Sequence, residues 1–160
     1  MIEKVTEATI QAVLMRWLMN EKKHEYVIPN SNSFFSWEAD LLSVTKAGLV
    51  HELEVKLNIY DYRADAKKHK WNYFEQVTSS PAYFWYATYD FEITPPNNAG
   101  WILVTQQPKL GWRVTVKKEA PRLNLWKVDT HRREAATRLL SWRLVHEYER
   151  MFLRESQVSK

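Results

Sequence analysis

Residues 49–57 read LVHELEVKL, and the interpretation of the neighbouring segments depends on this stretch. From His51 onward apolar and charged side chains alternate, a period of two that is typical of a β-strand. The pattern therefore predicts a strand whose two faces differ in character. One face carries Leu53, Val55 and Leu57, and the other carries Glu52, Glu54 and Lys56.

A hairpin is predicted before this strand and a helix after it. Residues 46–48 (KAG) form a turn, and residues 34–44 are expected to be extended, so the two extended segments pair as a hairpin. Residues 60–76 contain many helix formers and neither Gly nor Pro. A helix is expected there, ended by the Ser79-Ser80-Pro81 sequence.

The remaining elements follow from the same two periodicities. Apolar residues at helical spacing predict a first helix from Thr6 to about Glu21, and a short strand is expected at 26–28 before a turn at Pro29. A long helix is expected from Thr130, as its N-cap, to about Arg154. Three further strands, at 83–88, 101–105 and 112–116, are rich in aromatic and β-branched residues, and a loop at 95–98 separates the first two.

This order of elements predicts an α/β (or α+β) protein with a mixed sheet flanked by helices. The chain has 160 residues, of which 45% are hydrophobic and 26% charged, a composition typical of one globular domain. We expect a single domain over residues 1–155 and a polar tail at 156–160. Neither a membrane span nor a signal peptide is evident, so a cytoplasmic protein is expected.

Composition also limits the chemistry. Without cysteine, a disulfide framework, a thiolate zinc site and a cysteine nucleophile are excluded. Three glycines provide no phosphate-binding loop, and the five histidines have no paired metal-ligand spacing. Residues 1–108 have a net charge of −3 (10 Lys and Arg, 13 Asp and Glu), and residues 109–160 one of +7 (13 and 6). Such an asymmetry suits an enzyme that acts on a polyanion, although basic helices are often simply solvated.

Three residues are candidates for catalysis. Glu54 and Lys56 leave the same face of the predicted strand, roughly 7 Å apart. Antiparallel pairing in the hairpin brings Asp40 alongside Glu54. Two adjacent carboxylates repel one another unless a cation lies between them, and an oxygen-only site suits Mg²⁺ or Mn²⁺. The alternative is that Glu54 and Lys56 are solvent-facing charges of an edge strand.

A third carboxylate is expected to point inward. Glu7 lies on the same helical stripe as Ile10, Leu14 and Leu18, the apolar face of the first helix. In the helix at 60–76, Asp61 and Asp65 share a face. They are interpreted either as favourable charges near the start of a helix or as groups beside the site.

The whole arrangement resembles a known superfamily. A helix with an inward Glu, an Asp on a hairpin strand, Glu-x-Lys on the next strand and then a helix resemble the PD-(D/E)XK nucleases. Over residues 7–145 the chain more narrowly resembles the MmcB-like DNA repair proteins of that superfamily. The stretches that carry this resemblance are WEADLLSV (37–44), HELEVKLNIYDYRADAKKHKW (51–71), AYFWYA (82–87) and GWILVT (100–105).

This resemblance implies a restriction-endonuclease-like core and a magnesium- or manganese-dependent nuclease that hydrolyses DNA in repair or processing. Asp40, Glu54 and the carbonyl of Val55 would ligate the metal. Lys56 would orient or help to deprotonate the attacking water and stabilise charge on the phosphate, while Glu7 would hold a water or a second ion. The proline that usually precedes the aspartate is replaced by an alanine at position 39, which removes no ligand.

Contacts to nucleic acid are expected from the helix that follows. Its basic and aromatic residues suit phosphate contact and base stacking, although a solvated helix face is the alternative for each lysine. They are Arg63, Lys67, Lys68, Lys70 and Trp71.

Two other functions compete with the nuclease. A nuclease-like module that binds nucleic acid without cutting it would use the basic C-terminal residues, including Arg132, Arg133, Arg138 and Arg143. An assembly protein would instead expose Trp85, Trp101 or Trp112 to a protein partner. For the nuclease the expected partner is DNA, with RNA and a homodimer as further options.

Overall fold

The computed structural model describes residues 4–65 and 80–155, with side chains up to residue 152. Contacts divide the chain into two compact units, Met1–Val128 and Asp129–Lys160, which are described separately below. The expectation of one domain over residues 1–155 stays a prediction.

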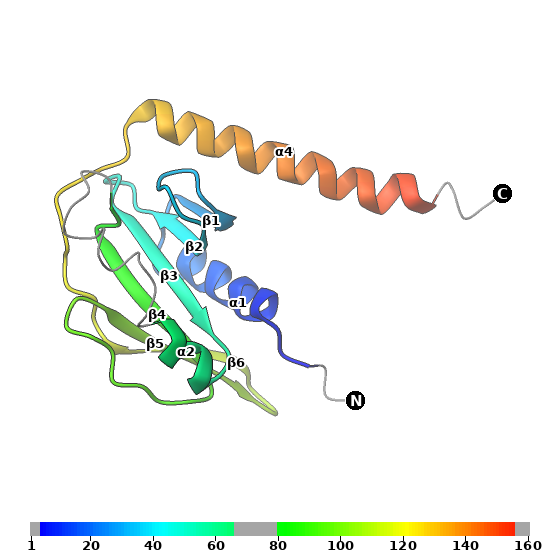
Figure 1. The fold of residues 1–160 in the computed structure, drawn as a ribbon. Helices are drawn as coiled ribbons and strands as arrows, with labels where there is room; N and C mark the ends of the chain where they lie inside the picture. The colour runs from blue at the N-terminus through cyan, green and yellow to red at the C-terminus, as the bar shows by residue number, and fades with distance from the viewer. Residues whose placement is uncertain (1–3, 66–79, 156–160) are drawn as a thin grey trace. The chain divides into compact units, whose positions relative to one another are not determined.

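The first unit is built on a six-stranded mixed sheet with the strands in chain order (Figure 1). The pairs β1–β2, β2–β3 and β5–β6 are antiparallel, and β3–β4 and β4–β5 are parallel. An α/β fold with a mixed sheet flanked by helices is therefore confirmed. The strands are β1 (Tyr26–Ser31), β2 (Ala39–Val44), β3 (Val50–Lys56), β4 (Tyr83–Tyr89), β5 (Gly100–Gln107) and β6 (Gly111–Lys118).

Helix α1 (Glu7–Asn20) covers one face of the sheet. It begins where the sequence predicts, near Thr6, which is its N-cap: the Thr6 hydroxyl accepts from the N–H of Thr9, and the Thr9 side chain accepts from the N–H of Thr6. Its apolar stripe packs on side chains that β1 to β5 direct toward it. This core contains Ile10, Leu14, Trp17, Leu18, Val27, Leu41, Leu53, Val55, Trp85, Ala87, Ile102 and Val104.

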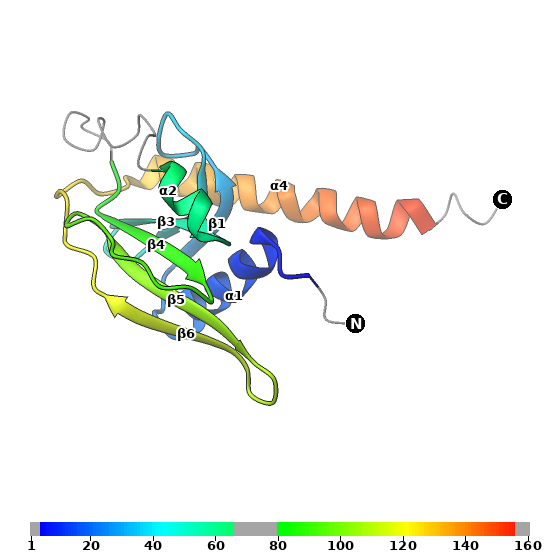
Figure 2. The ribbon, with the colours of Figure 1, turned by 60° about the horizontal axis from the view of Figure 1, so that its bottom comes forward.

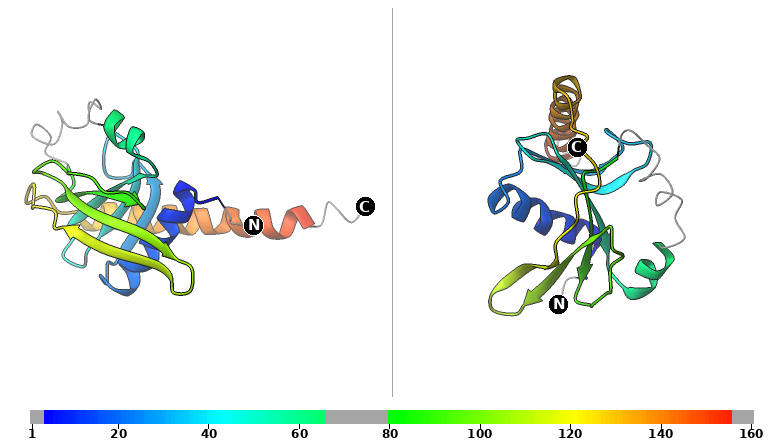
Figure 3. Two further views of the ribbon diagram at one scale, coloured as in Figure 1. Left: turned by 90° about the horizontal axis from the view of Figure 1, so that it is seen from below. Right: turned by 90° about the vertical axis from the view of Figure 1, so that its left-hand side faces the viewer.

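Helix α2 (Ile59–Asp65) lies on the opposite face, as the right-hand view of Figure 3 shows. A second apolar cluster packs there around Phe84, Tyr86 and Trp101, with Ile59 and Tyr62 of α2 against it. In Figure 2, α2 (green) lies near the ends of β3 and β4. The part of the predicted helix from residue 66 to 76 lies outside the described residues.

Two predicted boundaries were wrong near β1 and β2. The turn expected at Pro29 is part of β1, which pairs Pro29 with Leu41. Proline fits here because β1 is the edge strand, where a missing N–H breaks no ladder on the outer side. The extended segment expected from residue 34 becomes a strand only at Ala39; before it, Phe35 and Trp37 stack with ring centroids 4.9 Å apart.

The second unit contains helix α4 (Thr130–Glu155), whose length agrees with the prediction. Its N-cap is Asp129 and not Thr130, because the Asp129 carboxylate accepts from the N–H of Arg132 at 2.8 Å. Within residues 4–65 and 80–155, no helix is both long and apolar enough to cross a bilayer.

A pair of histidines is built into the sheet face that α1 covers. The indole N–H of Trp85 donates to Nδ1 of His51 at 3.1 Å, and the ring of His24 lies 4.6 Å from that of His51. Burial lowers the pKa of His51 to about 3 and that of His24 to about 4. Both rings are therefore neutral at pH 7.

Stability should fall on acidification through these histidines. As the pH drops from about 7 to 4.5, an unfolded chain protonates them and the folded chain does not, so the unfolding equilibrium takes up protons. In urea denaturation followed by circular dichroism, His51→Gln, which keeps an acceptor for Trp85, should lose about 1–2 kcal/mol less than the wild type over this range. His131→Gln is the control, and an equal loss in all three proteins would contradict the prediction.

Candidate functional site

The hairpin places Asp40 beside Glu54. The pairing of β2 with β3 matches Leu41 to Leu53, so one step further along this antiparallel register Asp40 falls opposite Glu54. Directly opposed residues project from the same face of a sheet, and Lys56, two residues on, projects there too. The three side chains therefore meet at the end of β3, on the face where α2 lies.

Asp40 is only partly compensated. Its Oδ2 accepts from the N–H of Val55 at 2.8 Å, and this bond and the nearby Lys56 favour the charged form. Burial and the negative charge of Glu54, with a smaller contribution from Glu7, outweigh them and raise the pKa of Asp40 to about 6. A cation that contacts Asp40 and Glu54 would relieve this repulsion.

Lys56 is held by two carboxylates. Its Nζ lies 2.7 Å from Oε1 of Glu54 and 3.2 Å from Oδ1 of Asp65. All three side chains are buried, with Glu54 3% and Lys56 5% exposed and Asp65 inaccessible. An ammonium has three N–H donors, and the third makes no hydrogen bond to any residue that the structure describes.

Tyr86 completes this network. It lies opposite Glu54 in the β3–β4 pairing, and its hydroxyl donates to Oδ2 of Asp65 at 2.7 Å. Burial and this hydrogen bond raise the pKa of Tyr86 far above its ordinary value, so the hydroxyl stays a donor at all pH values of interest. The network ties α2, which contains Asp65, to the centre of the sheet.

The inward position predicted for Glu7 was wrong. Glu7 is exposed, because it lies in the first turn of α1 and the buried stripe begins only at Ile10. The polar residue that does point inward is Gln11, whose Nε2 lies within hydrogen-bond distance of Oε1 of Glu7, Oδ1 of Asn30 and the carbonyl of Asp40. Glu7 thus reaches the site through Gln11 and through its charge.

The other predicted residues are less closely tied to the site. Val55 contacts Asp40 through its N–H, and a role of its carbonyl as a metal ligand stays a prediction. Arg63 is exposed on α2. The remaining nucleic-acid-binding residues that the sequence suggests, Lys67, Lys68, Lys70 and Trp71, lie outside the described residues.

A divalent ion fits the donors that are present. In the described parts of the chain, no group of three or more His, Cys, Asp or Glu side chains is arranged around one point. Mg²⁺, however, is commonly bound through one or two carboxylates with water in its other positions. Asp40 and Glu54 provide two such carboxylates side by side, and burial together with the charge of Glu54 raises the pKa of Asp40 there.

Sequence reasoning left Asp65 undecided and missed Tyr86 and Gln11. Asp65 shares its helix face with Asp61, yet Asp61 bonds to the side chain of Asn58, while Asp65 reaches Lys56. The available signal was a carboxylate, Asp65, in the helix that directly follows the strand ending in Lys56. Nothing in the pattern of AYFWYA singles out Tyr86, because only strand pairing sets it opposite Glu54.

Neutralising Asp40 should stabilise the metal-free protein. The pKa of Asp40 is raised from 3.8 to about 6 in the folded protein. The wild type therefore loses free energy of unfolding as the pH rises from about 4 to 6, because the unfolded chain ionises Asp40 more readily than the folded one. In EDTA at pH 8, Asp40→Asn should unfold with a free energy about 1–2 kcal/mol higher than the wild type, with no difference at pH 4. Urea titrations at the two pH values measure this, with exposed Asp90→Asn as control; a pH-independent difference would count against it.

Removing the hydroxyl of Tyr86 should destabilise the fold more than removing the hydroxyl of Tyr62. Tyr86→Phe leaves a buried carboxylate without one donor, at a cost of about 1.5–3 kcal/mol. Tyr62→Phe removes the same atom from a bond to the Thr94 carbonyl at an exposed position, and should cost less than about 1 kcal/mol. Thermal unfolding compares the two variants, and equal effects would show that the Asp65 bond adds nothing.

Comparison with known proteins shows the fold and no more. No protein-family model and no curated protein sequence matches the chain. Among solved structures, it is similar to the SPO1766 protein of unknown function from Silicibacter pomeroyi, with a TM-score of 0.61 and 15% sequence identity. The match covers 98% of this chain and 96% of that one, so the two share an arrangement of elements along nearly their whole length.

Proposed function

We propose that this protein is a nuclease that uses Mg²⁺ or Mn²⁺ to hydrolyse phosphodiester bonds of DNA. One observation carries the proposal: the carboxylates of Asp40 and Glu54 lie side by side on adjacent strands, with the ammonium of Lys56 on the same face. The order of α1, a hairpin strand that starts beside Asp40, the strand with Glu54 and Lys56, and then α2 is also the one that the resemblance to PD-(D/E)XK nucleases implies.

In this proposal the residues divide the work. Asp40 and Glu54, with the carbonyl of Val55, hold the ion. The ion, when bound, supplies a Lewis acid that polarises a phosphate oxygen and makes water a better nucleophile at neutral pH. Lys56, fixed by Glu54 and Asp65, keeps one N–H for the attacking water or for the negative charge that develops on the phosphate. Exposed Arg63 contacts the DNA backbone beside this site.

A second candidate function is supported by the same network. A lysine already paired with two buried carboxylates also suits a purely structural role, as in a module that binds nucleic acid without cutting it. An assembly protein with exposed tryptophans is less well supported, because Trp85 and Trp101 are 6% and 8% exposed and Trp112 is half-buried.

The test is to measure cleavage of plasmid DNA, single-stranded DNA and RNA in the presence of Mg²⁺, Mn²⁺ or EDTA. The proposal expects metal-dependent cleavage of DNA that falls by at least about 100-fold in Asp40→Asn and in Lys56→Gln, because each removes a charge that acts in the transition state. In thermal unfolding, Mg²⁺ should raise the Tm of the wild type and not that of Asp40→Asn.

The matched control is Asp90→Asn, the same change at an exposed turn, which should cleave like the wild type. Circular dichroism verifies that each variant is folded. Cleavage that survives in both site variants would refute the assigned residues. Salt-sensitive DNA binding that EDTA does not affect, with no product after long incubation, would favour the non-catalytic module.

A further inference from the structure

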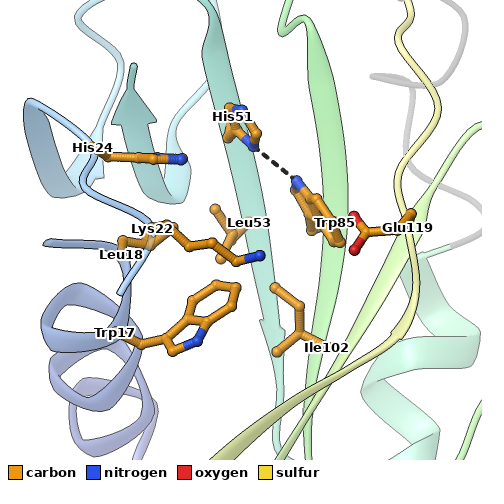
Figure 4. A pocket seen from close by; sticks show the side chains of 9 residues that line it. All are labelled: Trp17, Leu18, Lys22, His24, His51, Leu53, Trp85, Ile102 and Glu119. Carbon is orange, nitrogen blue, oxygen red and sulfur yellow. Dashed lines mark hydrogen bonds between the residues drawn. The ribbon is translucent and has the colours of Figure 1, made fainter. Parts of the chain in front are cut away.

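A small cavity opens on the sheet face opposite the carboxylates (Figure 4). Its volume is about 100 Å³. Because strand side chains alternate, β3 directs His51 and Leu53 into this cavity while Glu54 and Lys56 project from the other face. The cavity is thus a different site from the one proposed for nuclease chemistry.

Flat rings from three elements form part of its wall. Trp17 comes from α1, Trp85 from β4 and His51 from β3, and the rings of His51 and Trp85 are nearly parallel, at 10°. Leu53 and Ile102 supply apolar surface between them. Such walls favour a planar aromatic ring, which fits between rings at low conformational cost.

Neither histidine brings a charge to the cavity at neutral pH. The indole N–H of Trp85 can only donate, so Nδ1 of His51 is the acceptor and carries no proton. The lowered pKa values of His51 and His24 agree with two neutral rings. Nδ1 of His24 lies 2.8 Å from the hydroxyl of Ser43. The lining thus offers two neutral histidines that can accept or donate hydrogen bonds.

Two opposite charges line the cavity at separate places. The Lys22 ammonium lies 5.1 Å from the ring centroid of Trp17 and extends between Trp17 and Leu53 in Figure 4. The Glu119 carboxylate lies across the cavity, beside Trp85. Within the described residues, neither forms an ion pair with the other or with any other side chain. A bound molecule can therefore meet a cation at one end and an anion at the other.

We propose that this cavity binds a small amino-substituted aromatic carboxylic acid, with its carboxylate against Lys22, its ring between Trp17 and Trp85, and its N–H group toward Glu119. An apolar cavity of about 150 Å³ holds benzene. The present cavity is smaller but open on one side, so it accepts one ring and leaves the substituents at the rim, where the two charges lie.

Three related probes test the proposal on the full chain. 4-Aminobenzoate has both substituents, benzoate lacks the amine and aniline lacks the carboxylate. In ¹H–¹⁵N NMR titrations at pH 7, 4-aminobenzoate should shift the indole N–H signals of Trp17 and Trp85 with a Kd below about 1 mM. Benzoate and aniline should each bind about three- to tenfold more weakly, since each loses one charged contact at a partly exposed rim.

Variants of Lys22 and Glu119 distinguish specific binding in the cavity from non-specific binding to apolar surface. Lys22→Gln should abolish the preference for 4-aminobenzoate over aniline, whereas Lys23→Gln, at the next and equally exposed position, should leave it unchanged. Glu119→Gln should reduce the preference over benzoate. These surface changes preserve the fold. The absence of indole shifts at 10 mM 4-aminobenzoate, or affinities that Lys22→Gln leaves unchanged, would overturn the proposal.

Discussion

The burial of one ammonium between two carboxylates is the interaction on which this part of the fold depends. β3 has neighbouring strands on both sides and covered faces, so every charged side chain on it loses hydration. Lys56 is compensated by Glu54 and Asp65, and Asp65 by the hydroxyl of Tyr86. Because Asp65 belongs to α2, the same contacts tie that helix to the sheet. Removing any one member would take one partner away from a buried charge.

In the folded protein the charges of Asp40 and Lys56 are only partly compensated, and the proposed chemistry lies at these two residues. Asp40 has one backbone N–H against the repulsion of Glu54, and Lys56 retains one donor. A site that binds a cation and stabilises a phosphate needs this unsatisfied charge, which a purely structural network would instead neutralise. The cost of holding it is the stability that Asp40→Asn is expected to recover.

The alternation of side chains along β3 also places the two proposed sites on opposite faces of the sheet. The even-numbered residues from Glu52 to Lys56 are charged and face α2, while His51 and Leu53 face α1 and help to line the cavity. A ligand in the cavity would contact the strand that carries the carboxylates without reaching them. The two proposals therefore stand or fall by separate measurements.

Local patterns in the sequence alone predicted that α1 starts near Thr6, the strand at β3, the long helix α4 and the meeting of Asp40 with Glu54 across a hairpin. These depend on periodicity and turn residues, which act over a few positions. Only the tertiary structure decided that Pro29 lies in an edge strand, that Glu7 is exposed while Gln11 turns inward, and that Tyr86 bonds to Asp65. Those outcomes depend on which elements cover a residue and which strand pairs with it, contacts between segments that no local spacing encodes.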